Sequence, residues 1–275
     1  MPSKPVHIAQ ISDLHIKSPD TLAYGRVDTA NALERCVTAL NEFAPKPDLV
    51  VISGDLADTP TGEEYEHLKR LLAPLKVPFV SIPGNHDSRE LMRAAFPQAY
   101  ASASGPLNQR VEIGGVDLVL LDSSVHGKPH GELEMATLQW LDATLAAAPR
   151  KPTIVALHHP PFWTGIGHMD RMGLANPDAL EAVIARHSQV ERVVSGHLHR
   201  AIITRFGGTI ASTCPSPSHQ VALDLADDAQ SRFVMEPPGF QLHLWREGAS
   251  LITHTGAIGD FAGPYSFYEG GVLID

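Results

Sequence analysis

Short apolar segments recur through the first two-thirds of the chain, and a polar or glycine-containing loop follows each of them. They are rich in Val and Ile and hardly alternate with polar residues, which is typical of strands buried on both faces. Amphipathic segments lie between them; Leu33, Val37 and Leu40, for example, share one helical face. Strands that alternate with helices predict a layered α/β fold. The apolar segments are Val6–Ser12, Leu49–Ser53, Phe79–Ile82, Val116–Leu121, Thr153–Leu157 and Arg192–Ser195.

The sequence changes character after about residue 200, where β-type segments follow one another without a helical pattern. Gly207-Gly208 and Glu247-Gly248 separate them as turns. The β-type segments are Ala201–Arg205, Thr209–Thr213, Phe240–Arg246 and Leu251–His254. We therefore expect three parts. Residues 1–200 form an α/β core, and residues 201–255 form an antiparallel β extension that serves as a cap or a dimerisation element. The tail, residues 256–275, packs on the core.

Metal-binding side-chain types follow five of the predicted strands directly. In an α/β sheet the carboxyl ends of the strands share one edge, and ligands bind there. Imidazole, carboxylate and carboxamide groups therefore converge, and these groups suit first-row divalent ions. Gly54, Gly84 and Gly196 stand beside them, where a close backbone approach or a positive φ favours glycine. The converging residues are Asp13, His15, Asp55, Asn85, His86, His158, His197 and His199.

Each of these motifs alone has an ordinary structural explanation. Asp13 is a typical turn or cap residue at a strand end, and Gly54-Asp55 is a common turn. Asn85 is suited to an Asx turn before a helix. Independent turns are not expected to place so many metal-type ligands at successive strand ends. The combination therefore predicts a metal site.

Composition restricts the partners. The net charge of −10 argues against long nucleic acid, because binding to its phosphates requires a basic surface. A small anion remains compatible, since metal ions supply local positive charge. Cys36 and Cys214 form no disulfide framework or thiolate zinc motif, and free thiols in a reducing cytosol are the favoured interpretation, although one bridge between them stays open. No apolar stretch has the length of a membrane span and no secretory signal is evident, so a cytoplasmic location is expected.

At these residues the sequence resembles the calcineurin-like metallophosphoesterase superfamily. The blocks D-x-H, G-D-x-x-D, G-N-H-D, H and G-H-x-H occur in order between Asp13 and His199. The resemblance implies an α/β/β/α sandwich whose core, 1–200, is catalytic. It also implies two divalent ions (Mn, Fe, Zn or Co), one held by Asp13, His15 and His199, the other by Asn85, His158 and His197. Asp55 bridges the two ions in this scheme, and His86 lies near the substrate phosphate.

Shorter similarities indicate the branch of cyclic-nucleotide phosphodiesterases and glycerophosphodiesterases. That branch implies a homo-oligomer, a dimer or a larger assembly, and Tyr24, His168 and His219 as substrate-binding residues. The segments that carry this similarity are Tyr24-Gly25 with Asp28, Asp122-Ser123-Ser124, His158-His159-Pro160-Pro161, Pro215 to Gln220, and Phe261-Ala262-Gly263-Pro264.

We therefore expect a metal-dependent phosphodiesterase that hydrolyses a small glycerophosphodiester or a 3′,5′-cyclic nucleotide. The expected mechanism is in-line attack by a metal-bound hydroxide, with His86 and Asp55 as catalytic residues. His86 has two open roles, stabilising the transition state or protonating the leaving alkoxide. A phosphomonoesterase on the same fold is the alternative, and it would need additional cationic groups. A non-enzymatic interaction module is disfavoured because no ligand position is lost.

Overall fold

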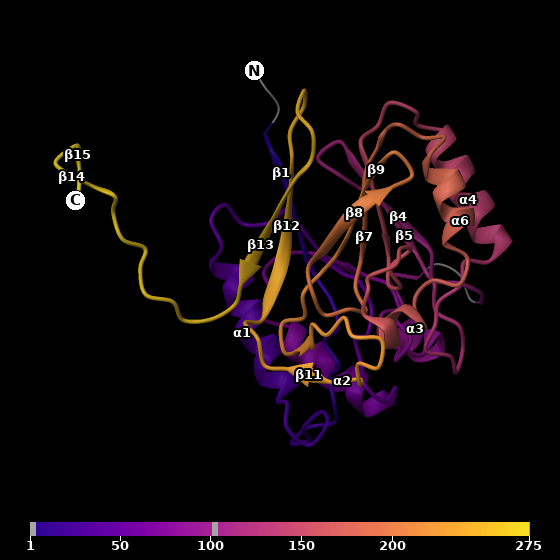
Figure 1. Cartoon of the computed structure of the whole chain (residues 1–275), viewed down its shortest axis with the longest axis horizontal. Coiled ribbons are helices and arrows are strands. Elements are labelled where there is room, and N and C mark those ends of the chain that lie inside the picture. Colours follow the sequence, from indigo (N-terminus) through magenta and orange to yellow (C-terminus); the bar gives the residue numbers. More distant parts are fainter. Residues whose placement is uncertain (1–3, 101–103, 275) are drawn as a thin grey trace.

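The computed structural model describes residues 4–100 and 104–274 of the 275-residue chain. Two β-sheets face each other, and helices cover their outer surfaces (Figure 1). The first sheet has five strands in the order β13-β12-β1-β2-β3, and the second has six in the order β4-β5-β6-β7-β9-β8. This is the α/β/β/α arrangement that the family resemblance implies, and it confirms the layered α/β fold predicted from the sequence pattern.

The first sheet is built around β1 (Val6–Ile11), with β2 (Leu49–Ile52) and β3 (Phe79–Ser81) parallel to it on one side. On its other side β12 (Gly239–Trp245) pairs antiparallel with β1, and β13 (Ile252–Ala257) pairs antiparallel with β12. β12 and β13 thus extend the sheet on the side of β1 that would otherwise be an unpaired edge.

The second sheet has a parallel centre and antiparallel edges. Its parallel strands are β5 (Val116–Leu121), β6 (Thr153–Leu157), β7 (Val190–Ser195) and β9 (Thr209–Thr213). The antiparallel edge strands are β4 (Gln109–Ile113) and β8 (Ile202–Phe206).

Three layers of apolar packing hold the sheets and helices together. Side chains such as Ile8, Leu118 and Val194 fill the space between the two sheets. One outer face packs on α1 (Thr29–Glu42), α2 (Gly62–Leu72) and α3 (Arg89–Ala95). The other packs on α4 (Met135–Ala146) and α6 (Pro177–Ile184), and the short α5 (Gly167–Asp170) lies in a loop between them. The parallel strands are continuously apolar because both of their faces are buried.

Local sequence signals mark the starts of several helices. Asp28 caps α1 by accepting the backbone N–H of Asn31 at 2.9 Å, and Pro177 is the first residue of α6. Proline is favoured there because its missing N–H has no partner in the first turn. The first turn of α2 carries Glu63 and Glu64, which favourably oppose the positive end of the helix dipole.

The region after residue 200 differs from the expected arrangement. Four of its strands, β8, β9, β12 and β13, belong to the two core sheets rather than to a separate extension. The hairpin of β10 (Gln220–Val221) and β11 (Phe233–Val234) is a two-stranded unit outside them. Strand pairing across 200 residues leaves no local sequence signal, which is why the sequence pattern alone suggested an appendage.

The C-terminal tail extends away from the sheets instead of packing on them (Figure 1). Every described residue after Ile258 is exposed. The tail includes a small hairpin, β14 (Tyr268–Glu269) with β15 (Val272–Leu273), and exposed aromatic side chains such as Phe261 and Tyr265. In the described ranges, no helix is both long enough and apolar enough to cross a membrane.

The α4 packing layer yields a stability prediction. Leu141 is fully buried against the second sheet, so Leu141→Ala should lower the free energy of unfolding by about 2–5 kcal/mol, because it removes apolar contacts and leaves a cavity. Leu223→Ala is the matched control: Leu223 is 63% exposed, and its substitution should change stability by about 0.5 kcal/mol or less. Chemical denaturation measures both, and equal effects would contradict this packing.

Candidate metal centre

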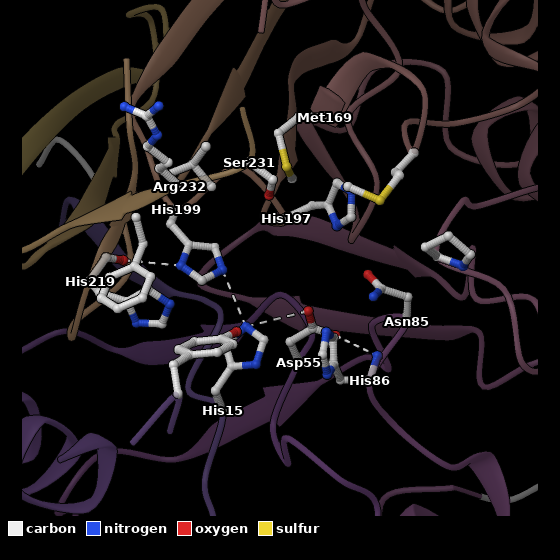
Figure 2. A pocket seen from close by; sticks show the side chains of 15 residues that line it. His15, Asp55, Asn85, His86, Met169, His197, His199, His219, Ser231 and Arg232 are labelled. Carbon is white, nitrogen blue, oxygen red and sulfur yellow. Dashed lines mark hydrogen bonds and ion pairs between the residues drawn. The ribbon is translucent and has the colours of Figure 1, made fainter. Parts of the chain in front are cut away.

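All seven predicted ligands meet at the carboxyl ends of the parallel strands. Figure 2 shows His15, Asp55 and His199 pointing toward one another, with His197 and Asn85 beyond Asp55. The loops after β1, β2, β3, β6 and β7 supply them, so five segments far apart in sequence build one centre.

Side-chain distances divide the ligands into two groups joined by Asp55. In the first group, Nε2 of His199 lies 3.4 Å from Oδ1 of Asp13 and 3.2 Å from Nε2 of His15. Asp55 Oδ2 lies 3.6 Å from His15 Nε2 and 3.3 Å from His158 Nε2. His158 Nε2 is in turn 3.2 Å from Asn85 Oδ1. Asp55 therefore occupies the position that a bridging carboxylate requires.

The backbone of these loops is held in an unusual conformation. Asp13, His15, Asp55, His197 and His199 all have positive φ, between 46° and 68°. Each such residue costs of order 1–3 kcal/mol and persists only where the surroundings impose it. Here the loops hold one another: the N–H of Asp13 bonds to the carbonyl of Gly54 at 3.0 Å, and that of His197 bonds to the Asp13 carboxylate at 3.0 Å.

Two glycines permit the close approach of these loops. Gly54 has a φ of 106°, and a Cβ there would collide with the His158 ring. A Cβ on Gly84 would overlap Oδ1 and the backbone nitrogen of Asp55. The glycines beside the predicted ligands are therefore needed for the geometry of the centre.

Burial sets the protonation of the imidazoles. Removal from water lowers the pKa of His197 and His199 to about 3, so both are neutral at physiological pH, the form that coordinates metals. Burial also opposes the charged form of His158, but the carboxylates of Asp55 and Asp13 outweigh it and raise the pKa of His158 to about 9. Burial opposes ionisation of Asp55, yet the attraction of His158 and His86 holds its pKa well below the ordinary value.

The donor set fits divalent cations. Nε2 of His197 is buried and has no hydrogen-bond partner among the described residues, although buried polar atoms are normally paired. It lies among carboxylate, carboxamide and other imidazole donors, and several sets of three ligand atoms lie within 4.8 Å of one another. A divalent ion would satisfy this nitrogen and neutralise the buried carboxylates.

Neighbouring groups hold the ligand rings in place. His15 Nδ1 is 3.1 Å from Asp58 Oδ1, and Lys17 Nζ donates to the other oxygen of Asp58 at 2.9 Å. Nδ1 of His158 donates to the carbonyl of Ser53 at 2.8 Å, and Nδ1 of His199 donates to that of His219 at 3.0 Å. In each case Nε2 is left toward the centre, and such partners orient metal-binding imidazoles.

Asp58 and Asp87 hold different parts of the centre in place. Asp58 orients the His15 imidazole. Asp87 instead accepts the backbone N–H groups of Leu56, Ala57 and Gly84 at 2.9–3.1 Å. It thus ties the β2 and β3 loops together, and it has no hydrogen bond or ion pair with a histidine in the described ranges.

His159 is a residue to which the sequence interpretation gave no role. It is fully buried, and its Nδ1 is 2.8 Å from Ser123 Oγ. One ring nitrogen of His159 lies within 4.8 Å of ring nitrogens of His158 and His197. Its ring packs at 4.9 Å from that of His197, measured between centroids. The only sequence signal was its position directly after His158.

A cavity of about 460 Å³ opens above the centre. Tyr24, His219 and Phe233 form one wall, with ring centroids 5.3–5.4 Å apart. Two predicted substrate-binding residues, Tyr24 and His219, therefore line it. His168 does not: it is buried in α5, and its neighbour Met169 reaches the cavity instead.

The β10–β11 hairpin supplies lining residues that sequence reasoning missed. Ser231, Arg232 and Phe233 lie there, on a loop without a recognisable motif. Arg232 is the one Lys or Arg among the described lining residues, and Figure 2 shows its guanidinium directed away from the predicted ligands. His86 lines the floor; its Nδ1 donates to the carbonyl of Asp58 at 2.7 Å.

Comparison with known proteins agrees with this geometry. The family model described as calcineurin-like phosphoesterase matches residues 6–201. A probable glycerophosphodiester phosphodiesterase GpdQ from Arcobacter nitrofigilis is 44% identical over 271 residues, covering 98% of this chain and 99% of that protein. The 3′,5′-cyclic adenosine monophosphate phosphodiesterase CpdA of Escherichia coli is 34% identical over 212 residues, covering 77% of this chain and 76% of that protein.

The fold is also shared with solved structures. A dimetal phosphatase from Danio rerio superposes with a TM-score of 0.64 at 14% identity, over 94% of this chain and all of that one. At this identity the likeness concerns the fold alone. The resemblance in the sequence motifs and the layered fold are both confirmed.

The approach of Gly84 to Asp55 yields a prediction. Gly84→Ala should displace the Asp55 carboxylate, because the added methyl overlaps its Oδ1, and the purified protein should hold markedly less metal. Gly62→Ala is the matched control, since nothing lies within 4 Å of a Cβ there. Elemental analysis measures metal per chain, and thermal unfolding checks that both variants fold. Wild-type metal content in a folded Gly84→Ala protein would contradict this assignment.

Proposed function

The chain belongs to the calcineurin-like phosphoesterase family, and on this premise we propose that it is a binuclear-metal-dependent phosphodiesterase for small diesters, in particular glycerophosphodiesters. One observation carries the proposal: Asp55 lies between two groups of metal-type ligands on the floor of a single cavity. Asp13, His15 and His199 would hold one ion, and the other would be held by Asn85, His158 and His197.

When bound, two divalent ions neutralise charge on the phosphoryl oxygens and lower the pKa of the water that attacks phosphorus. Manganese, iron, zinc and cobalt all suit this ligand set, and we propose that availability decides among them. Asp55 would contribute its carboxylate to both ligand groups, since its Oδ2 lies 3.6 Å from His15 Nε2 and 3.3 Å from His158 Nε2. Elemental analysis of protein purified without added metal identifies the ions.

His86 is the group placed to handle the proton. Its backbone N–H donates to Asp55 Oδ1 at 2.9 Å, and its Nδ1 is engaged with the Asp58 carbonyl. Nε2 is therefore the ring atom left to face a substrate in the cavity. From there it would donate a hydrogen bond to a phosphoryl oxygen or a proton to the leaving alkoxide.

The substrate class is supported by the cavity and the relatives. A phosphomonoester carries extra negative charge, and Arg232 is the one Lys or Arg among the described lining residues. An aromatic and apolar wall with few cations suits a monoanionic diester. The relative named as a probable glycerophosphodiester phosphodiesterase is 44% identical to this chain, against 34% for the cyclic AMP phosphodiesterase of Escherichia coli.

We also propose a cytoplasmic homo-oligomer. Both cysteines, Cys36 and Cys214, are buried and unbridged, which suits a reducing compartment. The tail exposes Phe261, Tyr265 and Phe267, apolar surface of the kind that mediates contacts between subunits. Analytical ultracentrifugation of the full chain tests the assembly.

A paired rate assay tests the substrate. Manganese-reconstituted enzyme should hydrolyse glycerophosphoethanolamine with a kcat/KM roughly tenfold or more above that for 3′,5′-cyclic AMP, because pocket contacts differ between the two leaving groups. A chromogenic diester serves as the activity control. A higher kcat/KM for cyclic AMP would instead assign the enzyme to cyclic nucleotides, and activity confined to monoesters would refute the proposal.

Substitution of His86 tests its role in catalysis. His86→Ala should lower kcat by about 10²–10⁴ while metal content stays near that of the wild type, because the lost imidazole acts on the substrate. His254→Ala is the control, since His254 is exposed on β13. Loss of metal with full activity in the remaining loaded enzyme would show that His86 is a ligand instead.

A further inference from the structure

A second cavity lies at the amino end of β7, whereas the metal ligands follow its carboxyl end. It has a volume of about 640 Å³. The start of β7, the β8–β9 turn and the residues just before β13 line it, and none of them belongs to the metal centre.

Two arginines lie in one row across the second sheet. Val193 of β7 pairs with Ala211 of β9, so Arg192 is level with Ile210, and Ile210 pairs with Arg205 of β8. Neighbouring strands are about 4.8 Å apart, so the two arginine Cα atoms are roughly 10 Å apart.

This row faces the other sheet. Val194, two residues beyond Arg192, packs between the sheets, and alternate residues of a strand point to the same face. Both arginines line the cavity together with Ser250 and Leu251, which follow β12. The cavity is therefore bounded by the edge of the second sheet and by the turn between β12 and β13.

Arg192 is buried without a partner. Its residue is 7% exposed, and its Nε is buried with no hydrogen bond to any described residue. Arginine is almost never buried unless it is paired, because an unpaired charge loses its hydration. Arg205, which is exposed, likewise forms no hydrogen bond or salt bridge within the described ranges.

The two glutamates that line the cavity have other hydrogen bonds. Glu191 Oε2 accepts the backbone N–H of Leu251 at 3.3 Å, and Glu181 Oε1 accepts that of Gly207 at 3.0 Å. Glu191 attracts Arg192 along the strand but makes no salt bridge with it within 4.0 Å among the described pairs. The guanidinium groups of Arg192 and Arg205 thus make no hydrogen bond or salt bridge with a described residue and are available to a ligand.

We propose that this cavity binds a small oxyanion, a phosphate or a carboxylate, between the guanidinium groups of Arg192 and Arg205. The planar guanidinium offers paired N–H donors that match two oxygens of such an anion. A bound anion joins β7 and β8, and it compensates the buried charge of Arg192. The site is separate from the metal centre and does not depend on the proposed function.

Hydrogen–deuterium exchange on the metal-loaded full chain locates the anion. Inorganic phosphate should protect peptides that contain residues 204–211 and 249–252, in addition to any protection near the metal ligands. A parallel titration with succinate shows whether a carboxylate occupies the same place, and the anion with the lower Kd is the preferred class.

Arg205→Gln is the decisive variant, because an exposed side chain is replaced and the fold should be kept. It should raise the Kd for the anion, measured from the protection of these peptides, about tenfold. This is the loss of affinity expected when one charged hydrogen bond is removed. Arg246→Gln removes the same charge from an exposed position that does not line the cavity, and should leave the protection unchanged.

Arg192→Gln provides the second variant and should abolish the protection. If this buried variant fails to fold, Arg205→Gln still decides. The proposal is overturned if neither anion protects these peptides, if protection appears only at the metal centre, or if Arg205→Gln binds the anion as tightly as Arg246→Gln.

Discussion

The carboxylate of Asp55 is the constraint on which the rest of the site depends. It must reach both groups of ligands, so it is buried between His15 and His158, where an isolated charge is unstable. Its positive φ, the glycine at position 84 and the N–H of His86 together keep it there. The loops after β1, β2, β3 and β7 are shaped to surround this one group.

A polar seam between the sheets supports that arrangement from below. Gln10 of β1 is fully buried; its side-chain amide donates to Ser53 Oγ at 2.8 Å and to the carbonyl of Ser195 at 3.1 Å. The side-chain oxygen of Gln10, Oε1, lies 3.2 Å from Nε2 of His243 on β12. These contacts tie the ends of β1, β2 and β7 together just before their ligands. Because such a network must be fully paired, it fixes the relation of the two sheets more specifically than apolar packing does.

The sequence predicted the parts of the site that local order determines. The apolar runs and the residues after them were enough to place Asp13, Asp55 and His197 at one edge, since parallel strands end together. The aromatic wall was only half predicted: Phe233 belongs to a short hairpin whose position depends on tertiary contacts. The pairing of β12 with β1 is likewise a non-local contact. The strands after residue 200 were therefore predicted as a separate extension, although they belong to the core sheets.

The distribution of charge explains how an acidic protein accommodates an anionic substrate. The chain has a net charge of −10, and the Arg232 side chain is directed away from the predicted ligands. Positive charge for the phosphate would therefore come from divalent ions held by the candidate ligands on the cavity floor. The wall of Tyr24, His219 and Phe233 adds apolar contact without adding charge. A single phosphodiester group matches this localised charge, whereas a polyanion would also be repelled by the net negative charge of the chain.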